Sequence, residues 1–489
     1  MVHKSLKVNV ILNVIKTIMS MIFPLITFPY ASRILLPEGI GKVNFANSII
    51  SYFSIISALG INIYALRESA KLRDDKIALS QFVKEVFIIN LLSTFVAYVL
   101  LFTSLFLVPK FFEYRKLIIV YSANMLFITL GIDWLYGAME DYFYTTVRSI
   151  AFQVLSLILL FLFVHSKDDY VKYAAINVVS TTGAGILNFI HSRKYISLRG
   201  TRKLHLKKHI SHIFILFSYT LAASVFTILD TSMLGFMSDS EQVGFYSGAS
   251  KIIRMIRDLF PAIFSVLTAR FSYYVSQNNQ EKINDISKKT LNFIFCFSIP
   301  IVIGLIILMN PIVLLLCGKN YEAAIPVAQI MAPLVVFSAC SGFLGGVVLF
   351  SQGKDKLYLL CTIIAAISDI LLNILFIPSF GAFGAALATV ITEGIIFVIY
   401  DCFLSSFIKQ LCIIKNLLEY ILSSFVMGIV VFIAQNLFHN IIVKLIVPTI
   451  CGIIVYGSCL LIFKNDFILE ILIFIKNKFI TKFKTTEQK

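Results

Sequence analysis

The chain has 489 residues, of which 58% are hydrophobic and only 14% are charged, and its mean hydropathy is +0.89. A soluble domain normally carries about 25% charged residues, so this composition excludes a soluble globular protein and predicts an all-α polytopic membrane protein. The formal net charge of +16 lies mostly in loops and tails, which is typical of cytoplasmic segments, so we expect no nucleic-acid partner.

Apolar stretches of about 20 residues, each long enough to cross a bilayer as a helix, predict about fourteen transmembrane helices. The polar breaks within 145–190 and 416–463 are short, so the helix boundaries there are the least defined. The N-terminal apolar run shows no small-residue cleavage site, so we interpret it as the first helix. The predicted spans are 9–32, 44–64, 82–108, 116–135, 145–165, 170–190, 213–237, 245–274, 290–317, 325–350, 357–377, 382–402, 416–437 and 440–463.

The distribution of Lys and Arg predicts the orientation of these helices. With the N-terminus inside, the inner segments hold about 26 Lys and Arg residues and the outer loops about nine. This ratio places both termini in the cytoplasm. No loop is long enough to form a domain outside the membrane.

An internal repeat appears at an offset of 203 residues. Residues 38–50 align without gaps on residues 241–253, and five of the thirteen positions are identical. Six spans per half give both halves the same orientation, which is a parallel repeat. We therefore expect two six-helix lobes plus two C-terminal helices. The predicted domains are an N-lobe (1–200), a basic cytoplasmic linker (201–212), a C-lobe (213–408), two further helices (409–463) and a basic cytoplasmic tail (464–489) that suits an interfacial helix.

The span 245–274 carries charges that are expensive in lipid. Lys251, Arg254 and Asp258 share one stripe of the helix, and Arg257 lies about 65° away from the centre of that stripe. A charge at the bilayer centre costs about 2.5–3.5 kcal/mol on insertion scales, so the stripe must face water or an anionic ligand. Two explanations need no ligand: Arg254 could form a salt bridge with Asp258, and Lys251 could snorkel outward to the membrane surface.

The first helix has a polar stripe of its own that includes Lys16, and its repeat counterpart carries Asp230. We expect the first two helices of both lobes to line a hydrophilic cavity, with Lys16 steering a substrate or anchoring the helix at the interface. Asp230 and Asp258 are candidates for H⁺ or Na⁺ coupling or for salt bridges. Asp133 and the only tryptophan, Trp134, lie at a predicted helix end and suggest an interfacial position.

Nothing in the sequence indicates a metal site, a cofactor or catalysis. The eight Cys residues include no CxxC pair, and most lie in apolar runs. His205, His209 and His212 have a spacing that suits metal ligands, but they lie in the basic linker without an acidic neighbour, which favours a solvated segment. P-loop, GxSxG and HExxH motifs are absent, so we do not expect an enzyme.

Three sequence motifs stand out: the loop at 33–42 with the helix that follows it, the pair of segments at 230–235 and 243–249, and the Gly-Ala run at 381–389. Together they resemble the polysaccharide-repeat flippases of the multidrug/oligosaccharidyl-lipid/polysaccharide exporter superfamily. The resemblance covers roughly residues 5–465 and implies a MATE-like fold. It also implies a flippase that moves oligosaccharide units on undecaprenyl pyrophosphate across the bacterial cytoplasmic membrane for O-antigen, capsule or exopolysaccharide synthesis.

Under this resemblance Arg254, Arg257 and Lys251 would meet the pyrophosphate. The partners would be the lipid-linked oligosaccharide and membrane lipids, with a polysaccharide polymerase and chain-length proteins as further candidates. A cation-coupled multidrug antiporter of the same superfamily is the main alternative, although cationic substrates would favour acids over the stripe's cations. A membrane-bound polymerase and a non-transporting scaffold are weaker alternatives, because the first lacks a long polar loop and the second leaves the stripe unexplained.

Overall fold

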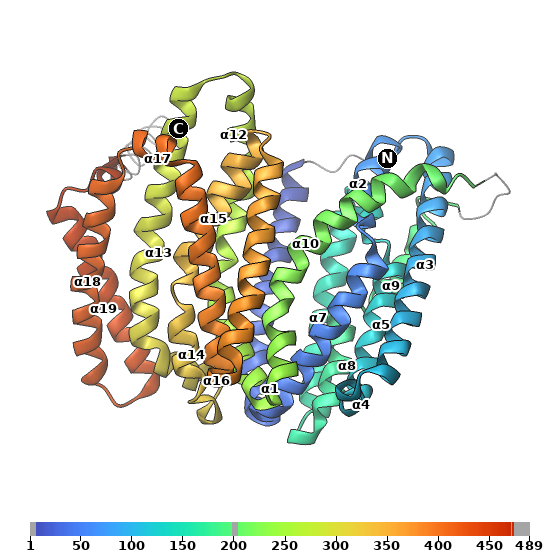
Figure 1. Cartoon of the computed structure of the whole chain (residues 1–489), viewed down its shortest axis with the longest axis horizontal. Coiled ribbons are helices and arrows are strands. Elements are labelled where there is room, and N and C mark those ends of the chain that lie inside the picture. The colour runs from blue at the N-terminus through green and yellow to red at the C-terminus, as the bar shows by residue number, and fades with distance from the viewer. Residues whose placement is uncertain (1–5, 198–203, 471, 474–489) are drawn as a thin grey trace, which may run out of the picture. The chain divides into compact units, whose positions relative to one another are not determined.

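The computed structural model describes residues 6–197, 204–470 and 472–473, and these residues form helices without any β-strand (Figure 1). Ten helices in this part of the chain are long and apolar enough to cross a membrane. The predicted all-α polytopic membrane fold is therefore confirmed. Most of the predicted interfacial tail helix lies outside the described residues.

The helices divide into two compact units, which are described separately. The first unit comprises residues 1–247, 316–320 and 373–382. Its helices are α1 (Leu6–Ala58), α2 (Ile61–Lys71), α3 (Lys76–Leu107), α4 (Pro109–Glu113), α5 (Arg115–Gly131), α6 (Asp133–Ala138), α7 (Tyr142–Phe163), η1 (Lys167–Asp169), α8 (Tyr170–Thr181), α9 (Gly185–Ser192) and α10 (Lys207–Met237).

The second unit comprises residues 248–315, 321–372 and 383–489. α11 (Ser240–Arg257) begins in the first unit and ends in the second. The elements that follow are α12 (Leu259–Ser276), α13 (Gln280–Leu316), η2 (Lys319–Tyr321), α14 (Ala324–Met331), α15 (Leu334–Phe343), the π-helical η3 (Leu344–Leu349), α16 (Asp355–Phe403), α17 (Ser405–Gln410), α18 (Ile414–Asn436) and α19 (Ile441–Ile462).

Two long helices contain kinks where the sequence predicts loops. α1 is non-helical only at Leu36 (φ 60°, ψ 174°), directly before Pro37, whose ring cannot continue a helix. α16 is non-helical only at Gly381 (φ 53°, ψ −127°), three residues after Pro378. The predicted separators at 33–43 and 378–381 are therefore single residues rather than loops. All fourteen predicted spans fall on helical segments, but the number of membrane crossings stays a prediction.

The predicted lobe boundaries also stay predictions, because the two compact units are defined by contacts between residues and the predicted lobes by the sequence repeat. α10 opens the second repeat in sequence, yet it packs against α1 and α2 within the first unit. The two C-terminal helices α18 and α19 pack as a pair in the second unit (Figure 1). They are tied to α13 by polar contacts: Asn416 donates to Asn292 Oδ1 (3.0 Å) and Tyr456 donates to the Cys296 carbonyl (2.7 Å).

The two copies of the sequence repeat meet in the first unit through reciprocal glycine contacts. A Cβ on Gly41 would lie 1.6 Å from the Ser240 carbonyl oxygen, and a Cβ on Gly244 would lie 1.9 Å from the Pro37 carbonyl oxygen. At the 203-residue offset, Gly41 corresponds to Gly244 and Pro37 to Ser240. We call these four residues the glycine seam. The contacts are symmetric, since each glycine packs against the backbone of the other copy, and this supports the internal repeat. Because neither position has room for a side chain, both copies have a glycine there.

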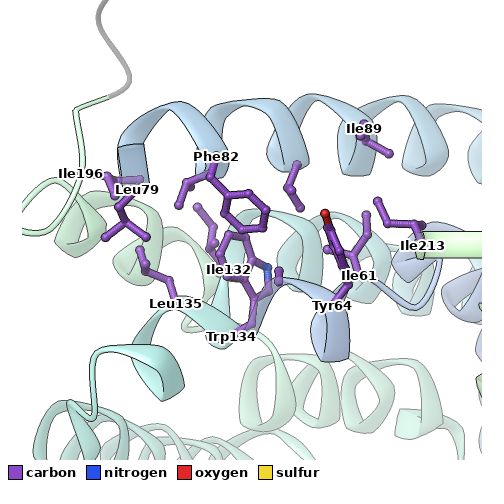
Figure 2. Packing of buried hydrophobic residues seen from close by; sticks show 13 residues of the cluster. Ile61, Tyr64, Leu79, Phe82, Ile89, Ile132, Trp134, Leu135, Ile196 and Ile213 are labelled. Carbon is purple, nitrogen blue, oxygen red and sulfur yellow. The ribbon is translucent and has the colours of Figure 1, made fainter. Parts of the chain in front are cut away.

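A hydrophobic cluster joins α2, α3 and α6 to the beginning of α10 (Figure 2). Trp134 lies inside this cluster with only 7% of its surface exposed, next to Phe82 (ring centroids 6.5 Å apart). Trp134 therefore packs against protein, and its interfacial position in the membrane stays a prediction. A helix-end position in sequence does not reveal that α6 packs against the beginning of α3.

Candidate functional site

The charged stripe of the second repeat lies where one helix ends and another begins. α11 ends at Arg257 and α12 begins at Leu259, so Asp258 breaks the span that the sequence predicts as continuous. The side chains of Arg254 and Asp258 are exposed, whereas those of Lys251 and Arg257 are half-buried. The break places the predicted cations in the last two turns of α11, where a helix dipole favours positive charge.

Arg257 is held by a polar chain within the second unit. Its Nη1 atom lies 3.5 Å from the hydroxyl of Ser338 on α15, and that hydroxyl donates to Oε1 of Glu393 on α16 (3.2 Å). Glu393 is 8% exposed, so a carboxylate there needs a nearby cation or a proton. This chain directs the guanidinium toward the Glu393 carboxylate, at a position where an anionic ligand could replace part of the carboxylate's interaction.

Asp230 is the centre of a buried polar group in the first unit. Its Oδ2 atom accepts from the hydroxyl of Tyr246 (2.6 Å), and its Oδ1 atom accepts from the side-chain amide of Asn373 (2.8 Å). Asp230 is 6% exposed and Asn373 is fully buried. Among the described residues, nothing donates to Oδ1 of Asn373. A carboxylate beside a buried amide oxygen without a donor is an oxygen-rich arrangement that suits a small cation.

The three motifs that resemble the flippase family meet around Asp230. Tyr246 belongs to the segment 243–249, and Gln242, just before it, accepts from the backbone N–H of Ala382 in the Gly-Ala run (2.9 Å). Gly235 packs so closely on Phe45 that a Cβ there would lie 2.0 Å from the ring. Motifs that are nearly 350 residues apart in sequence therefore form one packed region of the first unit.

Lys16 belongs to a second group of charges in the first unit. It lies within electrostatic range of Arg148 on α7 and of Asp133, which opens α6. Arg148 donates from Nη1 to Oδ1 of Asp133 (2.9 Å), and Asn188 donates to the same oxygen (2.8 Å). Two cations therefore share the Asp133 carboxylate.

Aromatic side chains continue this group along α7 and α9. The rings of Tyr144 and His191 stack with their centroids 3.9 Å apart, and the Arg148 guanidinium lies 5.9 Å from the Tyr144 centroid. The side chain of Arg148 is 11% exposed, although its partner Asp133 is 67% exposed. The stack restricts the guanidinium on one side and leaves the carboxylate accessible.

A pocket of about 350 Å³ in the first unit adjoins the Leu36 kink. Its polar lining includes both signs of charge: Glu38, Lys42, Lys167, Asp168, Tyr170, Glu241 and Asn320. Glu38 and Lys42 already form an ion pair (2.6 Å). This balance distinguishes the pocket from the Lys16 and Arg148 group, and it offers no excess of cations for a pyrophosphate.

The predicted site residues thus fall into three groups. Lys251, Arg254, Arg257 and Asp258 lie at the junction of α11 and α12, Lys16 lies with Arg148, and Asp230 lies with Tyr246 and Asn373. Sequence reasoning missed Arg148 and Asn373, although a cation and an amide inside apolar spans were visible signals. Ser338 gave no signal, because serine is common in membrane helices. The functional roles of all these residues stay predictions.

The expectation for the histidines of the linker is wrong at one position. His209 is 2% exposed, and its Nε2 atom lies 2.8 Å from Oε2 of Glu85 on α3. The segment therefore does have an acidic partner, which the sequence hides because Glu85 is 124 residues away. In the part of the chain that the structure describes, no group of three or more His, Cys, Asp or Glu residues could hold a metal ion.

Comparison with known proteins gives one family and several relatives. A family described as "Polysaccharide biosynthesis protein" matches residues 6–275, more than half of the chain. A candidate O-antigen transporter of Escherichia coli (strain K12) is 25% identical over 80% of this chain and 95% of its own length.

Solved structures of transporters share the fold. The lipid II flippase MurJ, in an inward closed conformation, superimposes with a TM-score of 0.75 at 20% identity, over 94% of this chain and all of the MurJ chain. An inward-facing multidrug transporter of the MATE family gives a TM-score of 0.64 at 13% identity, over 82% of this chain and 98% of the transporter. At these identities the likeness defines the fold alone.

Proposed function

Because the chain belongs to the polysaccharide biosynthesis protein family, we propose that it is a flippase for lipid-linked oligosaccharides. The substrate is a repeat unit on undecaprenyl pyrophosphate, and the protein moves it from the cytoplasmic to the outer leaflet. The observation that carries the proposal is the excess of cations in apolar helices of both units: Lys16 with Arg148, and Lys251, Arg254 and Arg257.

The chemistry of the head group explains why these cations are needed. A pyrophosphate carries concentrated negative charge, and a guanidinium can bind two of its oxygens at once. Arg254 is not covered by protein, so it is accessible to such a ligand. Arg257 is already positioned by Ser338 and Glu393, which reduces the entropy that binding must cost. The prenyl tail stays in lipid, while the charged head follows the polar side chains.

Alternating access is the proposed mode of transport. The chain is a multi-pass membrane protein of bacterial cytoplasmic-membrane type, with both termini in the cytoplasm according to its Lys and Arg distribution. The head group enters from the cytoplasm and leaves on the other side when the helices rearrange. No step forms or breaks a covalent bond, so the proposed function is not that of an enzyme. A polysaccharide polymerase and chain-length proteins would use the flipped product.

Asp230 is the proposed site of coupling to H⁺ or Na⁺. The arrangement of Asp230, Tyr246 and Asn373 supports this role, because it offers a buried carboxylate oxygen and the Asn373 amide oxygen. A proton would instead bind the carboxylate directly. Asp258, which is exposed at the break between α11 and α12, suits an ion pair with the cations of the stripe better than it suits a buried ion site.

A cation-coupled multidrug antiporter is the alternative function, and the MATE fold permits it. The charges of the stripe favour the flippase, because a cationic drug there would meet the three cations Lys251, Arg254 and Arg257 against the single acid Asp258. The family match also covers the helices that carry Lys16, Arg148 and the stripe.

The test replaces the cations of the stripe in a strain that depends on this protein for surface polysaccharide. We expect the double substitution Arg254→Ala and Arg257→Ala to abolish surface polymer, and the Lys versions to restore part of it. Arg270→Ala is the matched control, because Arg270 is an exposed arginine on α12, away from the stripe. Normal surface polymer in the double variant, at normal protein level, would contradict the proposal.

A further inference from the structure

A buried polar triad connects three helices of the first unit away from the residues assigned to transport. Glu85 on α3 is fully buried, His209 on α10 is 2% exposed, and Tyr64 on α2 is 5% exposed. The two ring nitrogens of His209 have different partners: Nε2 lies 2.8 Å from Glu85 Oε2, and Nδ1 lies 2.7 Å from the Tyr64 hydroxyl. The imidazole is therefore the only bridge between the carboxylate and the phenol in this triad.

The surroundings of Glu85 fit an ionised carboxylate. Its Oε1 atom accepts from the side chain of Gln81 (2.7 Å) and from the backbone N–H of His205 (2.9 Å). Lys208 lies 3.4 Å from Oε2. Since an ionised carboxylate only accepts, Nε2 of His209 carries a hydrogen and donates to it. In neutral His209 the other nitrogen, Nδ1, then accepts from the Tyr64 hydroxyl.

This geometry leaves one well-defined place for an additional proton, the Nδ1 atom of His209. When a proton binds there, Nδ1 donates to the oxygen of Tyr64, and the imidazolium forms an ion pair with Glu85. The bond to Glu85 already has an ionised acceptor, so the added proton changes the bond to Tyr64 from neutral to charge-assisted, which makes that bond about twice as strong. Tyr64 belongs to an apolar cluster in which Phe82 and Ile213 lie beside it (Figure 2), and Phe82 also contacts the His209 ring. A hydrogen bond is stronger in such an apolar environment than in water.

We propose that Glu85, His209 and Tyr64 form a proton-binding site that controls how firmly the beginning of α10 is docked on α2 and α3. The bound ligand is a single proton, and histidine is the side chain best suited to exchange a proton near neutral pH. α10 also carries Asp230, about 31 Å further along the helix at 1.5 Å per residue. The site therefore acts on the same helix as the proposed coupling residue, but it does not depend on the proposed function.

Other charged groups lie on the same helices as the triad, and they define the controls. Arg67 and Glu68 on α2 form an ion pair with each other (3.1 Å), and Lys84 precedes Glu85 on α3. Lysine, arginine and glutamate side chains ordinarily stay charged between pH 6 and pH 8.5. The other histidines next to this part of α10, His205 and His212, therefore serve as the controls for His209. Both are exposed, and the His212 ring stacks on Tyr64 at 6.1 Å.

The experiment measures hydrogen exchange of residues 205–216 in the full-length protein in nanodiscs at pH 6 and pH 8.5, corrected for intrinsic exchange. We expect wild-type protection to be about fivefold higher at pH 6, from the difference between a charge-assisted and a neutral hydrogen bond. His209→Gln keeps a donor and an acceptor but binds no proton, so its protection should not change with pH. His205→Gln and His212→Gln should respond to pH like the wild type.

Two outcomes would overturn the proposal. One is equal protection of the wild-type protein at both pH values, and the other is a His209→Gln variant whose protection depends on pH as strongly as that of the wild type. If His209→Gln does not fold, Glu85→Gln replaces it, because the amide keeps the size of the side chain but removes the ion pair. Glu85→Gln should also lose the pH response, and a retained response would count against the site. Hydrogen exchange is measured without substrate, so a negative result for the proton site does not bear on the flippase proposal. Likewise, a negative result in the flippase test does not bear on the proton site.

Discussion

The glycine seam gives the most quantitative prediction, because its backbones leave no room for a side chain. Gly41→Ala would place a Cβ 1.6 Å from the Ser240 carbonyl oxygen and 2.8 Å from the Gly244 nitrogen. An ordinary van der Waals contact begins at 3.4 Å, so the two segments would have to separate by about 1.8 Å. Both neighbours are backbone atoms, which cannot move aside as a flexible side chain can.

We expect Gly41→Ala to lower the free energy of unfolding by about 3 kcal/mol or more, the upper end of the range for overpacked cores. Gly244→Ala should have a similar effect, because its Cβ would lie 1.9 Å from the Pro37 carbonyl oxygen. The combined variant should cost less than the sum of the two, since one separation relieves both clashes. Denaturant titration in mixed micelles measures these differences.

Gly457→Ala on α19 is the matched control. No atom lies within 4 Å of its added Cβ, so the substitution should be neutral or should stabilise the helix by up to about 1 kcal/mol. If Gly41→Ala is as stable as Gly457→Ala, the close approach of the two repeat copies is refuted, and with it the structural argument for the repeat.

Three further predictions concern the polar groups. Asp230→Asn should leave exchange of labelled lipid between leaflets intact but should remove its response to an imposed H⁺ or Na⁺ gradient, and a retained response in proteoliposomes would exclude Asp230 as the coupling site. Tyr246→Phe removes one hydrogen bond to this buried carboxylate and should destabilise the protein by about 1.5–3 kcal/mol in denaturant titrations, so a neutral effect would contradict the described contact. Arg148→Ala should reduce flipping at least tenfold, as measured by surface polysaccharide, whereas the exposed Arg115→Ala should not; equal activity of the two variants would remove Arg148 from the site.

The sequence predicts the fold class well, because hydropathy reports directly on the environment of each segment. The helical ranges follow from runs of apolar residues that have to satisfy their backbone hydrogen bonds inside lipid. The sharp kinks at Leu36 and Gly381 were not predicted as such. Proline and glycine indicate an interruption of a helix, but they do not tell how few residues the interruption needs.

The candidate site was predicted only as far as single helices allow. Helical spacing identified the stripe that includes Arg254 and Arg257, since that pattern is local. The partners Ser338 and Glu393 lie on other helices, and sequence spacing carries no information about which helices meet. The same reason explains why the linker around His209 was expected to be solvated: its partner Glu85 belongs to α3.

Transport by the purified wild-type protein tests the central claim most directly. The protein is reconstituted into liposomes with a fluorescent undecaprenyl-pyrophosphate disaccharide, and its movement between leaflets is compared with the uptake of a monocationic dye. The charges of the site predict rapid movement of the anionic lipid-linked sugar and none of the dye beyond protein-free liposomes. Transport of the dye without movement of the lipid-linked sugar would contradict the account and favour the multidrug antiporter.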